Sequence, residues 1–477
     1  MNHAQLRVWP ALTGPTISPE LYGHQMEMVG RSVYDGIWAG RSSGNANEDG
    51  LRLDVLALFK HLRVPLLKWP GDHFSDYYHW ADGVGTGGNR PHRVNVPWQQ
   101  IEPNTFGTHE FARLCEKLAC RPWVNGNGLT GSLDEMLSWI EYGTFGGDTQ
   151  RTAERCHHGS PEPFDFPLWG MSRSTDWNLE GLSAMNPEIE VLVPLDEAWN
   201  SARTYPVRGA HSKGMGIAGV SVSHYFRLGS GAAFGKAGYH QTWTALQTFE
   251  RKLKRLIADL YRHYGERSPS IALGSWGVWH DEADAENGLE QPNTLRDALL
   301  AASVYHLLNQ HAGHVAKAAM AQAVNALQCL AKTEGPAMFL TPTYHVLDMM
   351  RGHRGARLLT HRLESPHQLL DGGGPGTKWR MSTLQVCASR QGKRLCITAV
   401  NRSFTESVPL QVEIREGDIA ALSGRLLHAD SASAENSFET PKRVSPERIE
   451  LTADGNTFHD TLPPHSLAAY SIMLGQG

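Results

Sequence analysis

Short apolar runs alternate with longer amphipathic segments between about residue 20 and residue 350. The apolar runs occupy residues 21–30, 64–70, 120–127, 166–172, 188–195, 216–226, 270–276 and 337–343. The segments between them, such as 54–62, 109–118, 132–142 and 240–264, repeat apolar residues at helical spacing. Eight strand–helix repeats of this kind predict a (β/α)8 TIM barrel of the α/β class. A doubly wound sheet is the rival fold, but no Gly-rich phosphate turn follows the first run.

The pattern changes after about residue 355, where apolar and polar residues alternate with a period of two. Such stretches occupy residues 384–391, 394–403, 408–416 and 467–474, with polar turns between them. This alternation predicts a C-terminal antiparallel β-sandwich. We therefore expect an N-terminal segment at 1–18 that joins the sandwich, a barrel at 19–354, and the sandwich at 355–477.

Composition and charge narrow the choice of partners. The 477 residues carry 44 Lys+Arg against 49 Asp+Glu, a net charge of −5. This balance predicts neither a nucleic acid nor a membrane as partner. The N-terminus lacks a signal-peptide pattern and the six cysteines show no CxxC pairing, which predicts reduced thiols in a cytoplasmic protein. No HExxH-like spacing suggests zinc, and we expect no metal and no cofactor.

Several longer motifs recur in the order and spacing of one glycosidase family. They occupy residues 23–37, 67–85, 90–111, 123–142, 158–171, 221–226, 294–330, 339–356 and 429–446. Together they cover nearly the whole chain, and they resemble the α-L-arabinofuranosidase family of retaining glycoside hydrolases. That resemblance implies the same barrel-plus-sandwich fold and a role in carbohydrate metabolism. Because similar enzymes are oligomeric, it also implies a homo-oligomer.

Both catalytic carboxylates of that family are missing at the matching positions. Retaining glycosidases need one carboxylate as nucleophile and one carboxyl group as acid/base. In the family, the acid/base Glu ends a Trp-x-x-Gly-Asn-Glu motif, where this chain has Ser174 preceded by Arg173. The nucleophile lies in Asp-Glu-Trp, where this chain has Ser275 followed by Trp276. An unactivated serine hydroxyl can take neither role.

Other sugar-binding positions of the family are kept unevenly. Glu27 matches a Glu on the first strand that holds sugar hydroxyls, and His224 with Tyr225 matches a His-Tyr pair on the sixth strand. Lys68 replaces an Arg, and His73 occupies a hydrogen-bonding position. For Tyr225 and His224, core packing is as good an interpretation as ligand contact. Trp276 is a packing residue or a sugar-stacking surface.

Substitutions around the expected sugar exchange negative for positive charge. Arg173, Lys68 and His73 suggest a site for an acidic sugar, with Arg173 as a planar fork for a carboxylate or phosphate. Four carboxylates are candidates for a relocated catalytic function: Asp72, Asp176, Asp281 and Glu282.

Three functions remain open from the sequence. The first is a pseudoenzyme that binds a furanoside, a related oligosaccharide or an acidic sugar without hydrolysing it efficiently. The second is an active glycoside hydrolase with relocated carboxylates. The third is a scaffold subunit that assembles with active homologues.

Overall fold

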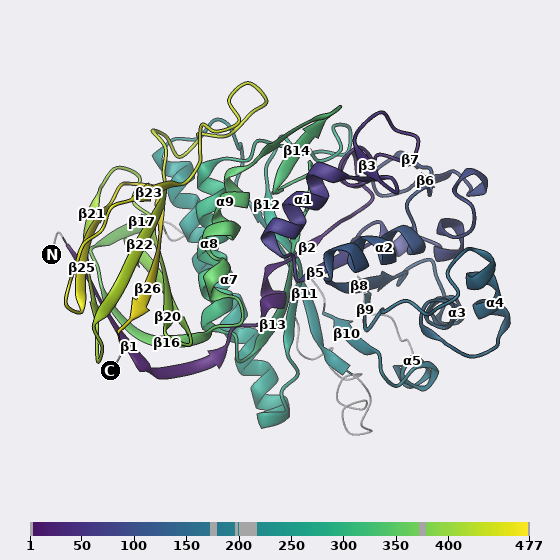
Figure 1. Cartoon of the computed structure of the whole chain (residues 1–477), viewed down its shortest axis with the longest axis horizontal. Coiled ribbons are helices and arrows are strands. Elements are labelled where there is room, and N and C mark those ends of the chain that lie inside the picture. The colour runs from purple at the N-terminus through teal and green to yellow at the C-terminus, as the bar shows by residue number, and fades with distance from the viewer. Residues whose placement is uncertain (1–2, 172–178, 196–198, 200–216, 372–377, 476–477) are drawn as a thin grey trace.

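A closed barrel of eight parallel strands forms the larger of two units in the computed structural model, which describes residues 3–171, 179–195, 199, 217–371 and 378–475. Figure 1 shows the barrel beside a second, all-β unit. The barrel strands are β2 (Gly23–Gln25), β5 (Leu66–Trp69), β8 (Arg121–Gly126), β9 (Leu168–Met171), β10 (Glu190–Pro194), β11 (Ile217–Arg227), β12 (Ile271–Trp279) and β13 (Val315–Ala321). This arrangement confirms the predicted TIM barrel.

Helices surround the barrel where the sequence has amphipathic spacing. They include α1 (Leu53–Leu62), α2 (Thr108–Leu118), α3 (Leu133–Thr144), α4 (Gln150–His157), α5 (Leu179–Met185), α7 (Lys236–Tyr264), α8 (Leu295–Gln310) and α9 (Pro342–Met349). Local chemistry fixes their ends. The Asp297 carboxylate accepts hydrogen bonds from both the N–H and the hydroxyl of Thr294 at 2.9 Å, which caps the start of α8. No helix in the described part of the chain is long and apolar enough to cross a bilayer.

The second unit is a β-sandwich built from one curled ten-stranded sheet. Its strands are β1 (Ala4–Thr16), β16 (Arg357–Glu364), β19 (Leu384–Gln391), β20 (Arg394–Asn401), β21 (Val408–Ile414), β22 (Ile419–Leu427), β23 (Glu447–Ile449), β24 (Ala453–Asp454), β25 (Thr457–Leu462) and β26 (Ser466–Leu474). The inward residues of both halves share one apolar core that includes Leu6, Ile397 and Phe458. The N-terminal strand β1 lies between β16 and β21, and it runs parallel to β21 while the other pairs are antiparallel.

The eighth barrel strand is not the run at 337–343. That run forms β15 (Ala337–Leu340), which pairs only with β14 (Ala331–Glu334) in a small hairpin. The barrel closes instead through β13, which pairs with β12 on one side and β2 on the other. The sequence of β13, VAKAAMA, is rich in alanine, a strong helix former, so its period-two pattern is faint. Burial inside the barrel overrides that preference.

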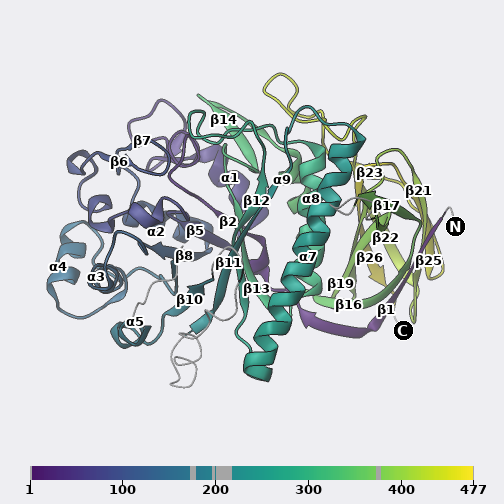
Figure 2. The same cartoon turned by 180° about the vertical axis from the view of Figure 1, so that it is seen from behind.

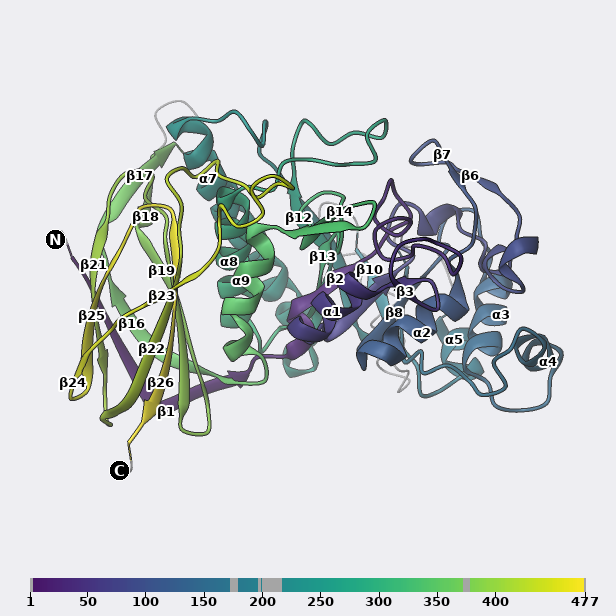
Figure 3. The same cartoon turned by 45° about the horizontal axis from the view of Figure 1, so that its top comes forward.

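Helices α7 and α8 lie between the barrel and the sandwich in both the front and rear views (Figure 2). At this junction His306 of α8 and His353 each contact the Thr398 hydroxyl of β20, at 2.7 and 2.8 Å. Three further two-stranded sheets lie outside the barrel and the ten-stranded sheet: β3 (Asn47–Glu48) with β4 (Leu51–Arg52), β6 (Arg93–Asn95) with β7 (Gln100–Glu102), and β17 (His367–Asp371) with β18 (Lys378–Ser382). In Figure 3 the β6–β7 hairpin stands on the same side of the barrel as β14.

Candidate functional site

The candidate site lies where the carboxyl ends of the barrel strands meet, the usual position of active sites in TIM barrels. Strand alternation decides which side chains enter it. Ser223, Tyr225 and Arg227 share one face of β11, and they are paired in register with Ser275, Gly277 and Trp279 of β12. The intervening His224 and Phe226 pair with Trp276 and Val278 on the opposite face.

Ser275 is fully buried and hydrogen-bonded to the hydroxyl of Tyr225. Burial raises the pKa of Tyr225 well above its usual value, and the nearby carboxylates of Asp72 and Glu27 raise it further. The phenol therefore stays neutral at ordinary pH. Neither member of this hydroxyl pair is activated as an anion, so the pair supplies a hydrogen-bonding surface and no nucleophile.

Lys68 is buried on β5, and its charge is compensated. Its ammonium group forms an ion pair with Asp72 and donates to the carbonyl oxygen of Gly274 at 3.1 Å. The same ammonium lies 4.9 Å from the centre of the Trp123 ring. The other oxygen of Asp72 accepts a hydrogen bond from Ser223 at 3.2 Å. Asp72 therefore compensates the positive charge that Lys68 was expected to bring to the sugar pocket.

Glu27 is buried just beyond the end of β2 and is held by three N–H donors. These are the backbone N–H of Phe74 at 2.8 Å and the side-chain amides of Gln25 and Gln322 at 3.1 and 3.2 Å. Burial raises the pKa of Glu27, with His73 lowering it and Asp72 raising it. Glu27 is thus a fixed, partly desolvated carboxyl group at the centre of the site.

Several hydrogen-bond acceptors around Glu27 are left unused. Within the described residues, the side-chain carbonyl oxygens of Gln25, Gln322 and Asn125 are buried without a hydrogen-bond partner. The amide nitrogen of Asn125 is occupied, because it donates to Gly71 and Ser75 at 2.9 Å. A buried carbonyl without a partner costs about 1–3 kcal/mol. Such acceptors match a ligand that brings hydroxyl donors.

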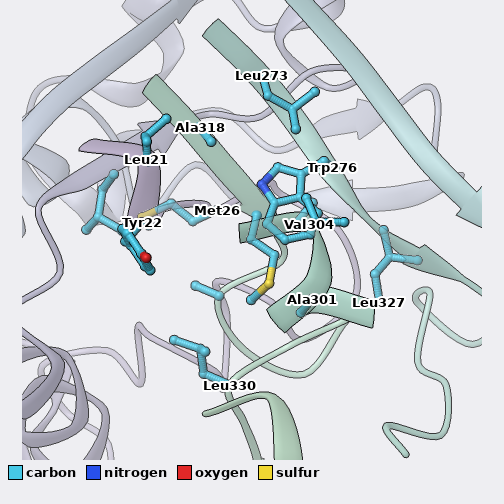
Figure 4. Packing of buried hydrophobic residues seen from close by; sticks show 14 of the residues in the cluster. Leu21, Tyr22, Met26, Leu273, Trp276, Ala301, Val304, Ala318, Leu327 and Leu330 are labelled. Atoms are coloured by element: carbon cyan, nitrogen blue, oxygen red, sulfur yellow. The ribbon is translucent and has the colours of Figure 1, made fainter. Parts of the chain in front are cut away.

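Two predicted ligand contacts, His224 and Trp276, face away from this site. His224 packs against Phe226 and against Phe249 of α7, and burial lowers its pKa to about 4. Trp276 packs edge-on against Tyr305 of α8, and Figure 4 shows its ring near Val304 of the same helix. Both residues pack in the shell between the barrel and its helices. Each is the direct neighbour of an inward-facing residue, Tyr225 or Ser275, so strand alternation turns it to the opposite face.

An aromatic rim completes the described part of the site. His73 is exposed, and its ring meets that of Trp98 at a centroid distance of 5.6 Å. Trp98 lies 6.4 Å from Trp279, and Trp279 meets Tyr225 edge-on at 5.3 Å. Arg227 covers the Trp279 ring, with its guanidinium carbon 3.8 Å from the ring centre.

The remaining candidates for relocated carboxylates are distributed differently. Glu282 accepts hydrogen bonds from Ser230 at 2.5 Å and from the N–H of Gly231 at 3.0 Å. Burial alone would raise the pKa of Glu282, but these hydrogen bonds outweigh it and lower the pKa. Glu282 is therefore an ionised loop anchor and a poor general acid. Asp281 is exposed and interacts electrostatically with Arg227. Arg173, Ser174 and Asp176 lie outside the described residues.

Within the residues that the structure describes, no cluster of three or more His, Cys, Asp or Glu side chains could hold a metal ion. The described site is built from hydroxyl, amide, carboxyl and aromatic groups. That set is suited to hydrogen-bonding and stacking against a polyhydroxylated ligand.

Removing Lys68 tests the buried ion pair. We expect Lys68→Met to lower the free energy of unfolding by about 3–5 kcal/mol, because it leaves the Asp72 carboxylate desolvated without its cation. Adding Asp72→Asn should recover most of that loss. Lys254→Met is a matched control, since Lys254 forms an exposed i,i+4 pair with Glu250 that is worth less than about 1 kcal/mol. Urea unfolding measures all three. Equal costs for the Lys68 and Lys254 variants would contradict the paired arrangement.

The fold and this site define a barrel-and-sandwich protein of the glycoside hydrolase class. Residues 58–177 match the family model described as Alpha-L-arabinofuranosidase 1 domain, and residues 274–466 match the Alpha-L-arabinofuranosidase C-terminal domain. An intracellular exo-alpha-L-arabinofuranosidase of Bacteroides ovatus is 30% identical, with 96% of this chain and 93% of that protein covered. The chain belongs to the α-L-arabinofuranosidase family.

Solved structures agree with this assignment. The arabinofuranosidase of Xanthomonas axonopodis pv. citri superimposes with a TM-score of 0.90 at 27% identity, covering 99% of this chain and all of that one. The α-L-arabinofuranosidase of Thermotoga maritima, solved as an arabinose complex, gives a TM-score of 0.84 at 29% identity with the same coverage. Relatives with the same fold are thus named as enzymes that act on arabinofuranosides.

Sequence reasoning missed several residues that the structure brings to the site. Gln25 lies two residues before Glu27, and Ser223 and Arg227 lie two residues on either side of Tyr225. A strict period of two from Glu27 and Tyr225 would have found all three. Gln322 and Asn125 are harder to find from the sequence, because Gln322 lies just beyond the end of β13 and Asn125 is the second-last residue of β8.

Proposed function

We propose that this protein binds a furanoside at the mouth of its barrel and does not hydrolyse it efficiently. Ser275 carries this proposal: a neutral hydroxyl, bonded to the neutral phenol of Tyr225, stands where the resemblance places the nucleophilic carboxylate. Without a nucleophile, the covalent route of a retaining glycosidase is closed. The resemblance also places Ser174 at the acid/base position, where a serine hydroxyl cannot protonate the leaving group.

Binding is supported by what surrounds Ser275. The unpaired carbonyl oxygens of Gln25, Gln322 and Asn125, together with the Glu27 carboxyl, offer acceptors to sugar hydroxyls. Because Asp72 neutralises Lys68, the described interior of the site favours a neutral ring over an acidic one. Lys68 therefore no longer argues for an acidic sugar inside the barrel, because its charge is paired with that of Asp72.

Hydrolysis by relocated carboxylates is the second candidate, and one observation favours it. Glu27 and Asp72 interact electrostatically with each other, and both act on Tyr225. Such a pair could divide the work of a glycosidase: Glu27, with its raised pKa, would be the acid, and the ion-paired Asp72 carboxylate would be the nucleophile. Both groups are already engaged, however: Asp72 with Lys68 and Ser223, and Glu27 with three N–H donors. Binding without efficient turnover is the better-supported function.

Calorimetric titration with methyl α-L-arabinofuranoside tests the binding. We expect saturable binding that weakens about tenfold in Gln322→Met, because the substitution removes one amide facing the ligand at similar volume. Gln368→Met is the matched control, since Gln368 donates to Arg402 in the sandwich unit, away from the barrel strands.

Two results would contradict the proposal. Absence of binding to the furanoside would favour the scaffold alternative, in which the barrel has lost its ligand. Equal weakening by the Gln322 and Gln368 variants would show that the ligand does not lie against Glu27 and its amide partners.

A further inference from the structure

A cation, Arg227, lies at the rim of the site. Arg227 ends β11 on the same face as Ser223 and Tyr225, and it lies directly beside Trp279 of β12 in the strand register. Its side chain is exposed. Within the described residues, its guanidinium group forms no hydrogen bond and no ion pair. This contrasts with Lys68, which is buried and fully compensated by Asp72.

The stacking of Arg227 on Trp279 prepares it to bind an anion. With the guanidinium carbon 3.8 Å from the ring centre, the cation is held by the aromatic face and loses less freedom when it binds. A guanidinium group that stacks on a ring keeps its N–H donors free. Two of these donors can bind the two oxygens of one carboxylate at the same time.

One neighbouring group at the rim, the Trp98 indole N–H, also lacks an acceptor among the described residues. The Trp98 side chain is 7% exposed, and within the described residues its indole N–H is buried without a partner. Its ring lies between those of His73 and Trp279. Asp281 acts electrostatically on Arg227 but forms no ion pair with it in the described chain. Asp281 therefore competes with an incoming anion, but it leaves the guanidinium N–H donors of Arg227 free. Among the described residues, the interior of the site therefore has hydrogen-bond acceptors without partners, and the rim has donors without partners.

We propose that Arg227, stacked on Trp279, is a specificity subsite for a carboxylate on the sugar unit joined to the bound furanose. The ligand class is an arabinofuranoside attached to a uronic acid. This inference rests on furanoside binding as the proposed function, and it assigns the acidic part of the ligand to the rim, outside the furanose position near Glu27.

Calorimetric titration with two matched disaccharides tests the subsite. One is α-L-arabinofuranose linked to galacturonic acid, and the other is its methyl ester, which differs only in charge. At low ionic strength we expect the acid to bind about tenfold more tightly than the ester. The ratio should approach one in Arg227→Ala and should rise in Asp281→Asn, which removes the competing anion. Raising the salt concentration should reduce the preference.

Arg251→Ala is the matched control, because Arg251 of α7 also stacks on a tryptophan, Trp379 of β18, with its guanidinium carbon 4.1 Å from the ring centre. That variant should keep the tenfold preference. Equal binding of acid and ester by the unaltered protein would overturn the subsite while leaving furanoside binding intact. A preference that survives Arg227→Ala would also overturn it. Failure of both disaccharides and of methyl α-L-arabinofuranoside to bind would instead overturn the proposed function itself.

Discussion

The purified protein is expected to release 4-nitrophenol from 4-nitrophenyl α-L-arabinofuranoside at least about 10⁴-fold more slowly than the Bacteroides ovatus relative under the same conditions. This aryl leaving group needs little protonation, so the assay isolates the loss of the nucleophile. At that position Ser275 is buried and bonded to Tyr225, whose pKa is raised by burial. No base in this pair is available to deprotonate the serine.

A faster rate would identify which alternative is correct. Hydrolysis within tenfold of the relative, abolished by Asp72→Asn, would establish that Asp72 has taken over part of the chemistry. Loss of the same activity in Asp281→Ala would point to the loop after β12. Activity that survives both changes would indicate a catalytic group outside the described residues, such as Asp176.

Acidification from pH 7.5 to pH 5 is expected to remove about 6 kcal/mol of unfolding free energy through three fully buried histidines. Burial lowers the pKa of His24 and His353 to about 3, with Arg354 adding to the effect at His24. Burial, aided by the neighbouring His353, also lowers the pKa of His306 well below its usual value. In the unfolded chain these side chains have pKa values near 6.5. Below that pH the unfolded state binds more protons, so stability falls as the pH falls.

Two buried carboxyl groups act in the opposite direction. Burial raises the pKa of Glu102 to about 7 and raises that of Glu27. The folded state therefore binds protons there that the unfolded state does not, which stabilises the protein as the pH falls through the same window. His109, His224 and His345, with pKa values lowered by burial to about 4, act in the same direction as the three fully buried histidines and oppose these two carboxyl groups. On balance stability is expected to fall between pH 7.5 and pH 5, because more buried histidines than buried carboxyl groups have shifted pKa values in this window.

Chemical unfolding at pH 7.5, 6 and 5 measures this dependence. His24→Leu is the informative variant, because within the described residues neither ring nitrogen of His24 has a hydrogen-bond partner. It should reduce the acid-induced loss by about 2 kcal/mol. His459→Leu, at a position exposed in β25, should leave the loss unchanged. A stability that is flat from pH 7.5 to pH 5 would contradict the buried neutral histidines.

The barrel and sandwich could be predicted because their strands and helices carry clear periodicities over whole elements. The eighth strand could not, since VAKAAMA favours a helix locally and becomes a strand only through its barrel neighbours. Within the site, Ser275 and Tyr225 were found through the motif, and they are in contact. For His224 and Trp276 the choice between packing and ligand contact stayed open, because a motif gives residue types, whereas strand parity decides which face each side chain takes. The compensation of Lys68 by Asp72 depends on side-chain packing, which sequence spacing alone does not determine.

A crystal structure of the protein grown with 4-nitrophenyl α-L-arabinofuranoside tests the central claim most directly. Binding without efficient hydrolysis predicts the intact glycoside at the barrel mouth. Its furanose hydroxyls should lie within hydrogen-bonding distance of the Gln25, Gln322 and Asn125 carbonyl oxygens and the Glu27 carboxyl group. Free arabinose in the site, a covalent glycosyl–protein bond, or a barrel mouth without ligand at saturating concentration would contradict it.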